Sequence, residues 1–199
     1  MDAEELLRRF GLHPPQAFER FVRQIRQLPK FPSKWLYAAE PPEILVQGDV
    51  LGPIEYVAVS EENRHGIVTS DVMLVSNTCD LVPGQSDFAL AAPVIELEFY
   101  TRPSDSTAES WDQHLAAVRR FEVIPYYYLP NSDGLEESFV DLTRIVHLPT
   151  PYLADSYRSH QVARKASLTL KGHLLFLAKL AHFLVRLEAR EAGRSTEEQ

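Results

Sequence analysis

The sequence predicts an α+β fold in which a small antiparallel sheet lies between helical ends. Helix-forming, amphipathic stretches occupy residues 1–40 and 151–199, whereas residues 41–150 contain short β-branched runs separated by turn residues. These runs lack the strand–helix–strand alternation of a parallel sheet. We therefore expect five or six short strands curled into a small β-barrel with one inserted helix over residues 110–120, and a C-terminal segment that packs on the N-terminal one.

The N-terminal segment predicts two helices, over residues 3–10 and 16–28, separated by Gly11 and the Pro14–Pro15 pair. The second helix gathers its apolar side chains on one face, namely Phe18, Phe21, Val22, Ile25 and Leu28. We expect this face to pack against another apolar surface of the chain.

The middle segment predicts a first strand at residues 44–51, which residues 54–60 either continue or pair with. Further strands are predicted at residues 71–76, 88–100, 122–129, 137–142 and 145–148. Gly48 is expected to bend the first strand, and residues 61–66 to form a polar turn. The continuous apolar run Val72–Val75 predicts a strand that is buried on both faces. Ser110 is the expected N-cap of the inserted helix.

The C-terminal segment predicts an irregular or partly helical stretch over residues 152–166, followed by a long helix from Leu170 to about residue 191. Ser167 or Thr169 is expected to cap this helix.

The apolar stripe of the final helix is wider than one face of a barrel requires. We expect the N-terminal helices to cover part of it and the remainder to serve self-association or another protein subunit. Under that hypothesis, polar residues in place of Phe176, Leu180 and Phe183 abolish assembly without unfolding the chain.

The net charge of −8 is unevenly divided along the chain. Residues 40–140 carry four Lys/Arg and eighteen Asp/Glu, a net charge of −14, whereas residues 1–39 carry +3 and residues 141–190 carry +5. An acidic surface binds phosphates poorly, so nucleic acid is expected to meet only the basic ends. The alternative is that the basic ends and the acidic middle pack together.

Composition also bears on compartment and cofactors. The single cysteine, Cys79, excludes an internal disulfide framework and a multi-cysteine zinc site, and a lone thiol fits a reducing compartment. The acidic N-terminus lacks the layout of a signal peptide, and charged residues interrupt the apolar stretch 170–187. We expect a cytoplasmic protein without a membrane span. The sequence has no glycine-rich nucleotide motif, so neither a cofactor nor a metal is expected.

Short motifs over residues 44–148 resemble the PemK/MazF-like toxin family. They are the strand start Gly48–Asp49–Val50, the buried strand that ends at Ser76, the strand Ala92–Pro93–Val94, and Val140–Asp141–Leu142 followed by Ile145–Val146. The resemblance implies an SH3-like barrel and a role in a bacterial toxin–antitoxin, mobile-element or defence system.

The same resemblance implies a metal-free ribonuclease acting on single-stranded RNA. In that family the activity depends on an Arg-Pro pair before the Ser-ending strand and on a Thr after the Pro-containing strand. Here those positions read Thr69–Ser70–Asp71 and Val94–Ile95. The resemblance therefore does not extend to the ribonuclease site.

The main candidate site is the loop Ser76–Asp80, which follows a buried strand. Cys79 is a nucleophile in one interpretation, with His65, His114 or His147 as its base. In a second, Ser76, Asn77, Thr78 and Asp80 form a binding loop, and Asp80 recognises a basic or amide group. In a third, the polar residues stabilise the turn and Cys79 is a small buried side chain.

Two further groups are candidates. His160, Arg164, Lys165 and Lys171 form a basic cluster that either contacts phosphate or is a solvated face. Tyr126–Tyr127–Tyr128 and Trp111 either form an aromatic surface or pack in the core. The leading hypothesis is a non-catalytic binding or adaptor module, and the alternatives are a divergent endoribonuclease or a hydrolase that uses Cys79.

Overall fold

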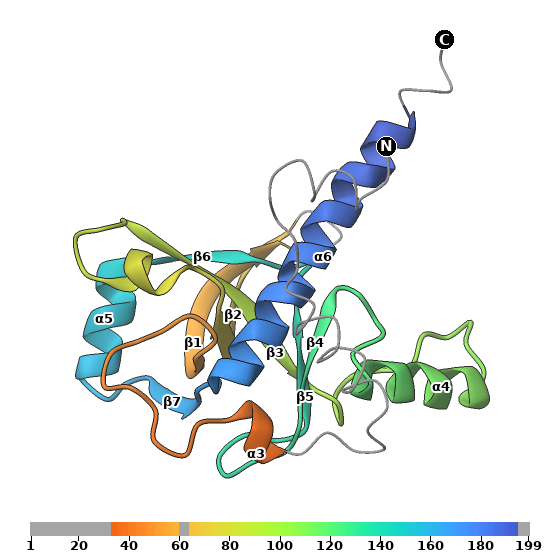
Figure 1. Ribbon diagram of the computed structural model, residues 1–199, viewed down its shortest axis with the longest axis horizontal. Coiled ribbons are helices and arrows are strands. Elements are labelled where there is room, and N and C mark those ends of the chain that lie inside the picture. The colour runs from red at the N-terminus through yellow and green to blue at the C-terminus, as the bar shows by residue number, and fades with distance from the viewer. Residues whose placement is uncertain (1–32, 60–63, 195–199) are drawn as a thin grey trace.

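The computed structural model describes residues 33–59 and 64–194, so the helices expected over residues 3–10 and 16–28 lie outside the described residues. The predicted α+β class is confirmed (Figure 1). The strands are β1 (Val50–Val59), β2 (His65–Leu74), β3 (Phe88–Glu96), β4 (Tyr126–Leu129), β5 (Ser138–Asp141), β6 (Val146–Pro149) and β7 (Ala163–Ala166). The helices are α3 (Ser33–Leu36), α4 (Ala108–Arg119), α5 (Thr150–Arg158) and α6 (Leu170–Arg194), with a 3-10 turn η1 (Thr78–Leu81).

The strands form one antiparallel sheet in the order β4–β5–β3–β2–β1–β7, with β6 also paired to β3. β6 pairs with Phe88–Ala91 of β3 and β5 with Val94–Glu96, so β3 changes partner part-way along its length. The sheet is not closed, and the barrel expected from the sequence is not confirmed.

Both faces of the sheet are covered at the C-terminal half of β2, which explains the continuous apolar run there. Val72 and Leu74 belong to a core completed by η1 and α5, whereas Met73 and Val75 belong to the core under α3, α4 and α6. The prediction that this strand is buried on both faces is confirmed. Figure 1 shows α6 crossing the sheet and continuing beyond it at its C-terminal end.

Several element boundaries differ from the sequence prediction. β1 begins only at Val50, because Gly48 has a φ of 91° and the Asp49 side chain accepts a hydrogen bond from the backbone N–H of Val46, which makes residues 46–49 a turn. The cap of α4 is Thr107 rather than Ser110, whose N–H donates to Thr107 Oγ1. Strand β7 was not predicted.

The C-terminal helix begins where the sequence predicted. The Thr169 Oγ1 atom accepts a hydrogen bond from the N–H of Gly172 at 3.1 Å and donates to the carbonyl of Trp35 at 2.6 Å. Thr169 therefore caps α6 and ties its first turn to α3.

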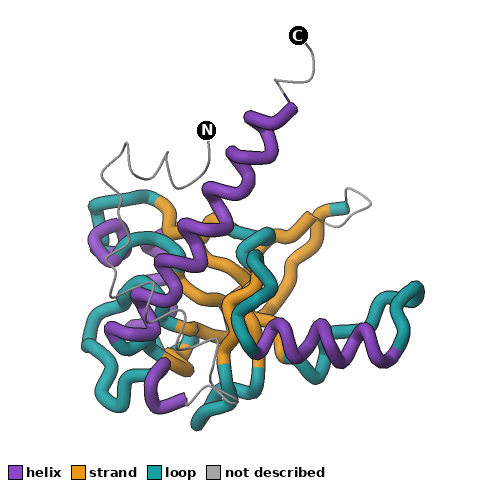
Figure 2. Tube along the Cα trace, turned by 45° about the vertical axis from the view of Figure 1, so that its right-hand side comes forward, coloured by secondary structure: helices purple, strands orange, loops and turns teal. Residues whose placement is uncertain are grey.

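β2 begins at His65, six residues before the predicted start. Its first half pairs with the second half of β1, with Val57 opposite Ile67 and Tyr56 opposite Val68. Figure 2 shows these paired ends projecting from the rest of the sheet. We call residues 54–59 and 65–70 the arm.

Candidate functional site

The loop Ser76–Asp80 divides into anchors and outward-facing residues. The Ser76 hydroxyl accepts a hydrogen bond from the N–H of Leu90 at 2.7 Å, and Thr78 Oγ1 accepts one from the N–H of Gln47 at 3.2 Å. Both side chains are thereby used in holding the turn. Asn77 and Cys79 are exposed, and Asp80 is half-buried. The interpretation of Cys79 as a buried side chain is wrong.

A buried glutamine links this turn to the C-terminal helix. The side-chain amide of Gln47 donates to the carbonyl of Val75 at 2.6 Å, and its oxygen lies 2.9 Å from His173 Nε2. Because that oxygen can only accept, His173 carries its proton on Nε2. Burial lowers the pKa of His173, which favours the neutral ring, although the protonated ring can make the same contact.

The histidines proposed as a base for Cys79 lie in other surroundings. His114 Nε2 is 3.3 Å from the hydroxyl of Tyr100, and the ring of His147 lies 6.4 Å from that of Phe88. His65 begins β2 at the end of the arm. Within the described part of the chain, no hydrogen bond joins Cys79 to a histidine.

Among the ion pairs of the described residues, Asp49–Arg164 is the most buried, and it joins the start of β1 to β7. Arg164 Nε lies 3.0 Å from Asp49 Oδ2, and the two side chains are 8% and 0% exposed. The guanidinium also donates to the carbonyls of Pro42 and Ile44 and stacks over Tyr157, 5.2 Å from the ring centre. The pair thus joins residues 42–49 to residues 157–164, two segments that are distant in sequence.

The Asp49 carboxylate is incompletely satisfied. Its Oδ1 atom and the neighbouring Ser167 Oγ are buried without a well-formed hydrogen bond. Burial raises the pKa of Asp49, while Ser167, the Val46 N–H and Arg164 act in the opposite direction. The ion pair therefore has a structural role, and the buried Asp49 carboxylate depends on Arg164 to offset its charge.

The predicted basic cluster separates into individual contacts. Lys165 forms an ion pair with Asp71 at 2.7 Å, and the Lys171 ammonium lies 5.2 Å from the centre of the Trp35 ring. Arg164 is used at Asp49, and His160 is an exposed residue just after α5 with a φ of 60°. Three of the four residues, Arg164, Lys165 and Lys171, therefore contact partners within the chain.

The base of α4 is attached by aromatic and ionic contacts. Trp111 stacks on His114 at 5.4 Å, and the Tyr100 hydroxyl lies 3.3 Å from both His114 Nε2 and the Tyr126 hydroxyl. Tyr126 is half-buried in this group. The predicted association of Trp111 with this strand is therefore made through Tyr100, a residue that the sequence did not single out.

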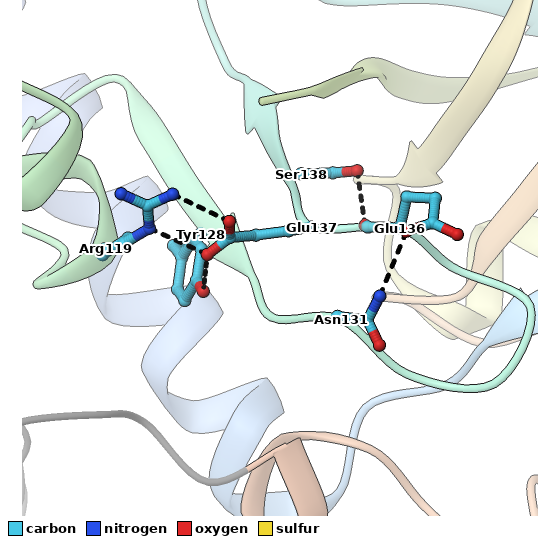
Figure 3. A network of polar contacts seen from close by, with 6 residues as sticks. All are labelled: Arg119, Tyr128, Asn131, Glu136, Glu137 and Ser138. Atoms are coloured by element: carbon cyan, nitrogen blue, oxygen red, sulfur yellow. Dashed lines mark hydrogen bonds and ion pairs between the residues drawn. The ribbon is translucent and has the colours of Figure 1, made fainter. Parts of the chain in front are cut away.

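The end of α4 is fixed by the network in Figure 3. Arg119 donates two hydrogen bonds of 2.8 Å to the Glu137 carboxylate, and the Tyr128 hydroxyl donates to the same carboxylate at 2.5 Å. Burial raises the pKa of Tyr128, and the adjacent carboxylate adds to this. Tyr128 therefore has a structural role, because its hydroxyl is held by the Glu137 carboxylate.

The C-terminal helix exposes apolar side chains that differ from those named in the sequence hypothesis. Phe176 is fully buried, and Leu180 and Phe183 pack partly buried against the core, so these three are not an exposed face. Among residues 170–184, the exposed apolar side chains are instead Leu170, Leu174, Leu177, Ala181 and Leu184. We call them the α6 stripe.

The arm exposes a second apolar surface. Ile67 is 76% exposed and its cross-strand partner Val57 is 64% exposed. The opposite face carries the exposed Val68 beside the half-buried Tyr56. Sequence reasoning missed this surface because Gly66 was assigned to a turn, although the β-branched run Ile67–Val68–Thr69 was the signal for a strand.

Comparisons with known proteins identify no relative: no family model matches the chain, and neither a curated protein nor a solved structure gives a significant match. Within residues 33–59 and 64–194, no helix combines the length and apolarity needed to cross a membrane. The same described residues contain no cluster of three or more His, Cys, Asp or Glu side chains placed to hold a metal ion.

Proposed function

We propose that this protein is a non-catalytic binding module that acts through the α6 stripe. The observation that carries this proposal is the spacing of the exposed residues Leu170, Leu174, Leu177, Ala181 and Leu184, which recur at intervals of four and three. This 4–3 repeat is the seam by which one helix packs along another. The partner is therefore a protein that presents an amphipathic helix.

The charge of α6 specifies that partner further. The helix carries five basic and two acidic residues. Lys179 is buried and donates to the carbonyl of Phe121, which leaves four basic residues, Lys171, Arg186, Arg190 and Arg194, against Glu188 and Glu191. A partner helix with acidic residues beside its apolar face complements this excess. An RNA or DNA partner is less well supported, because Arg164, Lys165 and Lys171 each have a partner within the chain.

We also propose that the sheet is related to the PemK/MazF-like, SH3-like barrel. Support comes from the placement of the resembling motifs on or directly beside β1, β2, β3, β5 and β6, and from the approach of β1 to β6. At the family's catalytic positions, Asp71 forms an ion pair with Lys165, and Val94–Ile95 pair with β5. These contacts favour a binding role over an endoribonuclease.

The biological setting that follows from this relationship is a bacterial toxin–antitoxin, mobile-element or defence system, in which the module acts as an adaptor. A Cys79-dependent hydrolase is the alternative, and the exposure of the thiol is the observation that favours it. Replacement of Cys79 by Ser distinguishes the two, because an adaptor retains its binding and a hydrolase loses its activity.

The test is a capture experiment followed by reconstitution. The wild type and the double variant Leu174→Glu/Leu177→Glu are used as baits in cells, and the protein retained only by the wild type is identified and purified. We expect a complex of the two purified proteins whose affinity falls about 100-fold in the double variant, as for the loss of two hot-spot contacts. Phe99→Glu is the matched control, because Phe99 is exposed but lies off the stripe.

Unchanged affinity in the double variant contradicts the proposal. So does an equal loss in Phe99→Glu, because a non-specific effect of added negative charge then explains the result.

A further inference from the structure

We propose that the arm is a dimerisation element in which strand β2 pairs with β2 of a second copy of this chain. The proposal is independent of the α6 stripe, which lies on another element. It rests on three properties of the arm: an unpaired edge, apolar side chains on both faces, and the absence of charge along residues 65–70.

The edge of β2 is free along the arm. β2 pairs with β3 only through Val72–Leu74, so His65–Thr69 have β1 on one side and no described strand on the other. All five of these residues are exposed. Backbone N–H and C=O groups on such an edge are a template for another strand.

The arm is also expected to be only marginally stable when its two strands are exposed to solvent on their own. A two-stranded hairpin is marginally stable in water, and β-branched apolar residues gain stability from neighbours on the same face of a sheet. Joining two arms makes a four-stranded sheet in which Ile67 and Val57 gain such neighbours.

The charge distribution favours a second copy as the occupant. Residues 65–70 contain no Asp, Glu, Lys or Arg, in a chain whose net charge is −8. The next acidic residue on β2, Asp71, forms an ion pair with Lys165. Glu55 lies on β1 opposite Thr69, so two copies of Glu55 are separated by at least three strand spacings, ~14 Å, beyond the ~8 Å screening length at physiological salt.

The register follows from the exposure of the side chains. Residues paired across antiparallel strands share a face, so a two-fold axis at Ile67 creates a row of Val57, Ile67 and the same two residues of the second copy. An axis at Val68 creates the corresponding row with Tyr56 on the other face. Ile67 is 76% exposed and Val68 only 38%, so pairing at Ile67 buries more apolar surface.

A crosslinking experiment tests both the dimer and its register. Cys79→Ser removes the native exposed thiol, and Ile67→Cys or Val57→Cys is added to it. Paired residues in an antiparallel sheet have Cα atoms about 4.5–5.5 Å apart, which a disulfide can bridge, whereas two copies of residue 57 are ~14 Å apart. We expect oxidation to give a crosslinked dimer with Cys at 67 and none with Cys at 57.

Sedimentation of the full chain provides the second measurement. We expect the wild type to be dimeric in a dilution series and Ile67→Lys to weaken the dimer about 100-fold, with unchanged circular dichroism. The double variant Leu174→Glu/Leu177→Glu should remain dimeric, which separates this proposal from the binding role of α6. A monomeric wild type, or equal crosslinking at positions 57 and 67, overturns the proposal.

Discussion

Replacing Arg164 by Met should cost this protein about 3–5 kcal/mol of folding free energy, the amount typical when one member of a buried ion pair is removed. Arg164 lies 3.0 Å from a fully buried Asp49, whose Oδ1 atom already lacks a well-formed hydrogen bond. Without the guanidinium, the carboxylate is left as an uncompensated buried charge. Total stabilities are only about 5–15 kcal/mol, so the effect is large.

The assay is urea denaturation of the full chain at pH 7. Arg158→Met is the matched control, because its ion pair with Asp155 at 3.2 Å is exposed and should contribute under about 1 kcal/mol. Asp49→Asn combined with Arg164→Met should recover part of the loss, since the amide removes the buried charge.

The pH dependence has a defined sign. Burial raises the pKa of Asp49 from its usual 3.8, and loss of Arg164 raises that pKa further. Above pH 3.8, the folded state then holds a proton that the unfolded state releases, so this group's contribution to stability falls as pH rises through the folded-state pKa. The defect of Arg164→Met should therefore be smaller near pH 4 than at pH 7. A loss under about 1 kcal/mol at pH 7, or a larger defect at low pH, refutes the reasoning.

Two other predictions concern single surface positions. His160→Gly should stabilise the fold by about 0.5–1 kcal/mol and raise Tm by about 1–4 °C, because His160 follows the cap of α5 with a φ of 60°, which glycine adopts without strain. His160→Ala should give no such gain, and an equal gain from alanine contradicts this cause. The Cys79 thiol should react with a disulfide reagent in the native protein within about tenfold of its rate in denaturant, because it is exposed. Protection that ends only on unfolding would show instead that the thiol is covered.

The parts of the fold that follow from local patterns could be predicted from the sequence. The apolar run Val72–Val75 gave a strand buried on both faces, and Thr169 gave the start of the last helix. Each of these two features is encoded by residues that are adjacent in sequence, within one strand or one helical turn. The start of β1 could not be placed, because it depends on Gly48 adopting a positive φ and on the Asp49 side chain bonding to Val46.

The contacts of the candidate site could not be predicted from the sequence, because they join residues that are far apart along the chain. His173 lies against Gln47, and Arg164 against Asp49, across more than a hundred residues. Periodicity identified a surplus of apolar residues on α6, but not which of them the core uses. The exposed ones became evident only from the packing of Phe176 and Leu180 on the sheet.

The central claim, that the α6 stripe binds a partner helix, is tested most directly by labelling a cysteine placed on it. In Cys79→Ser/Leu174→Cys, the account predicts rapid maleimide labelling of the protein alone and protection when the purified partner is added. Slow labelling of the protein alone would show that the stripe is covered within the chain, for example by residues 16–28. Equal labelling of the free protein and of the complex would show that the partner binds elsewhere, and either result contradicts the claim.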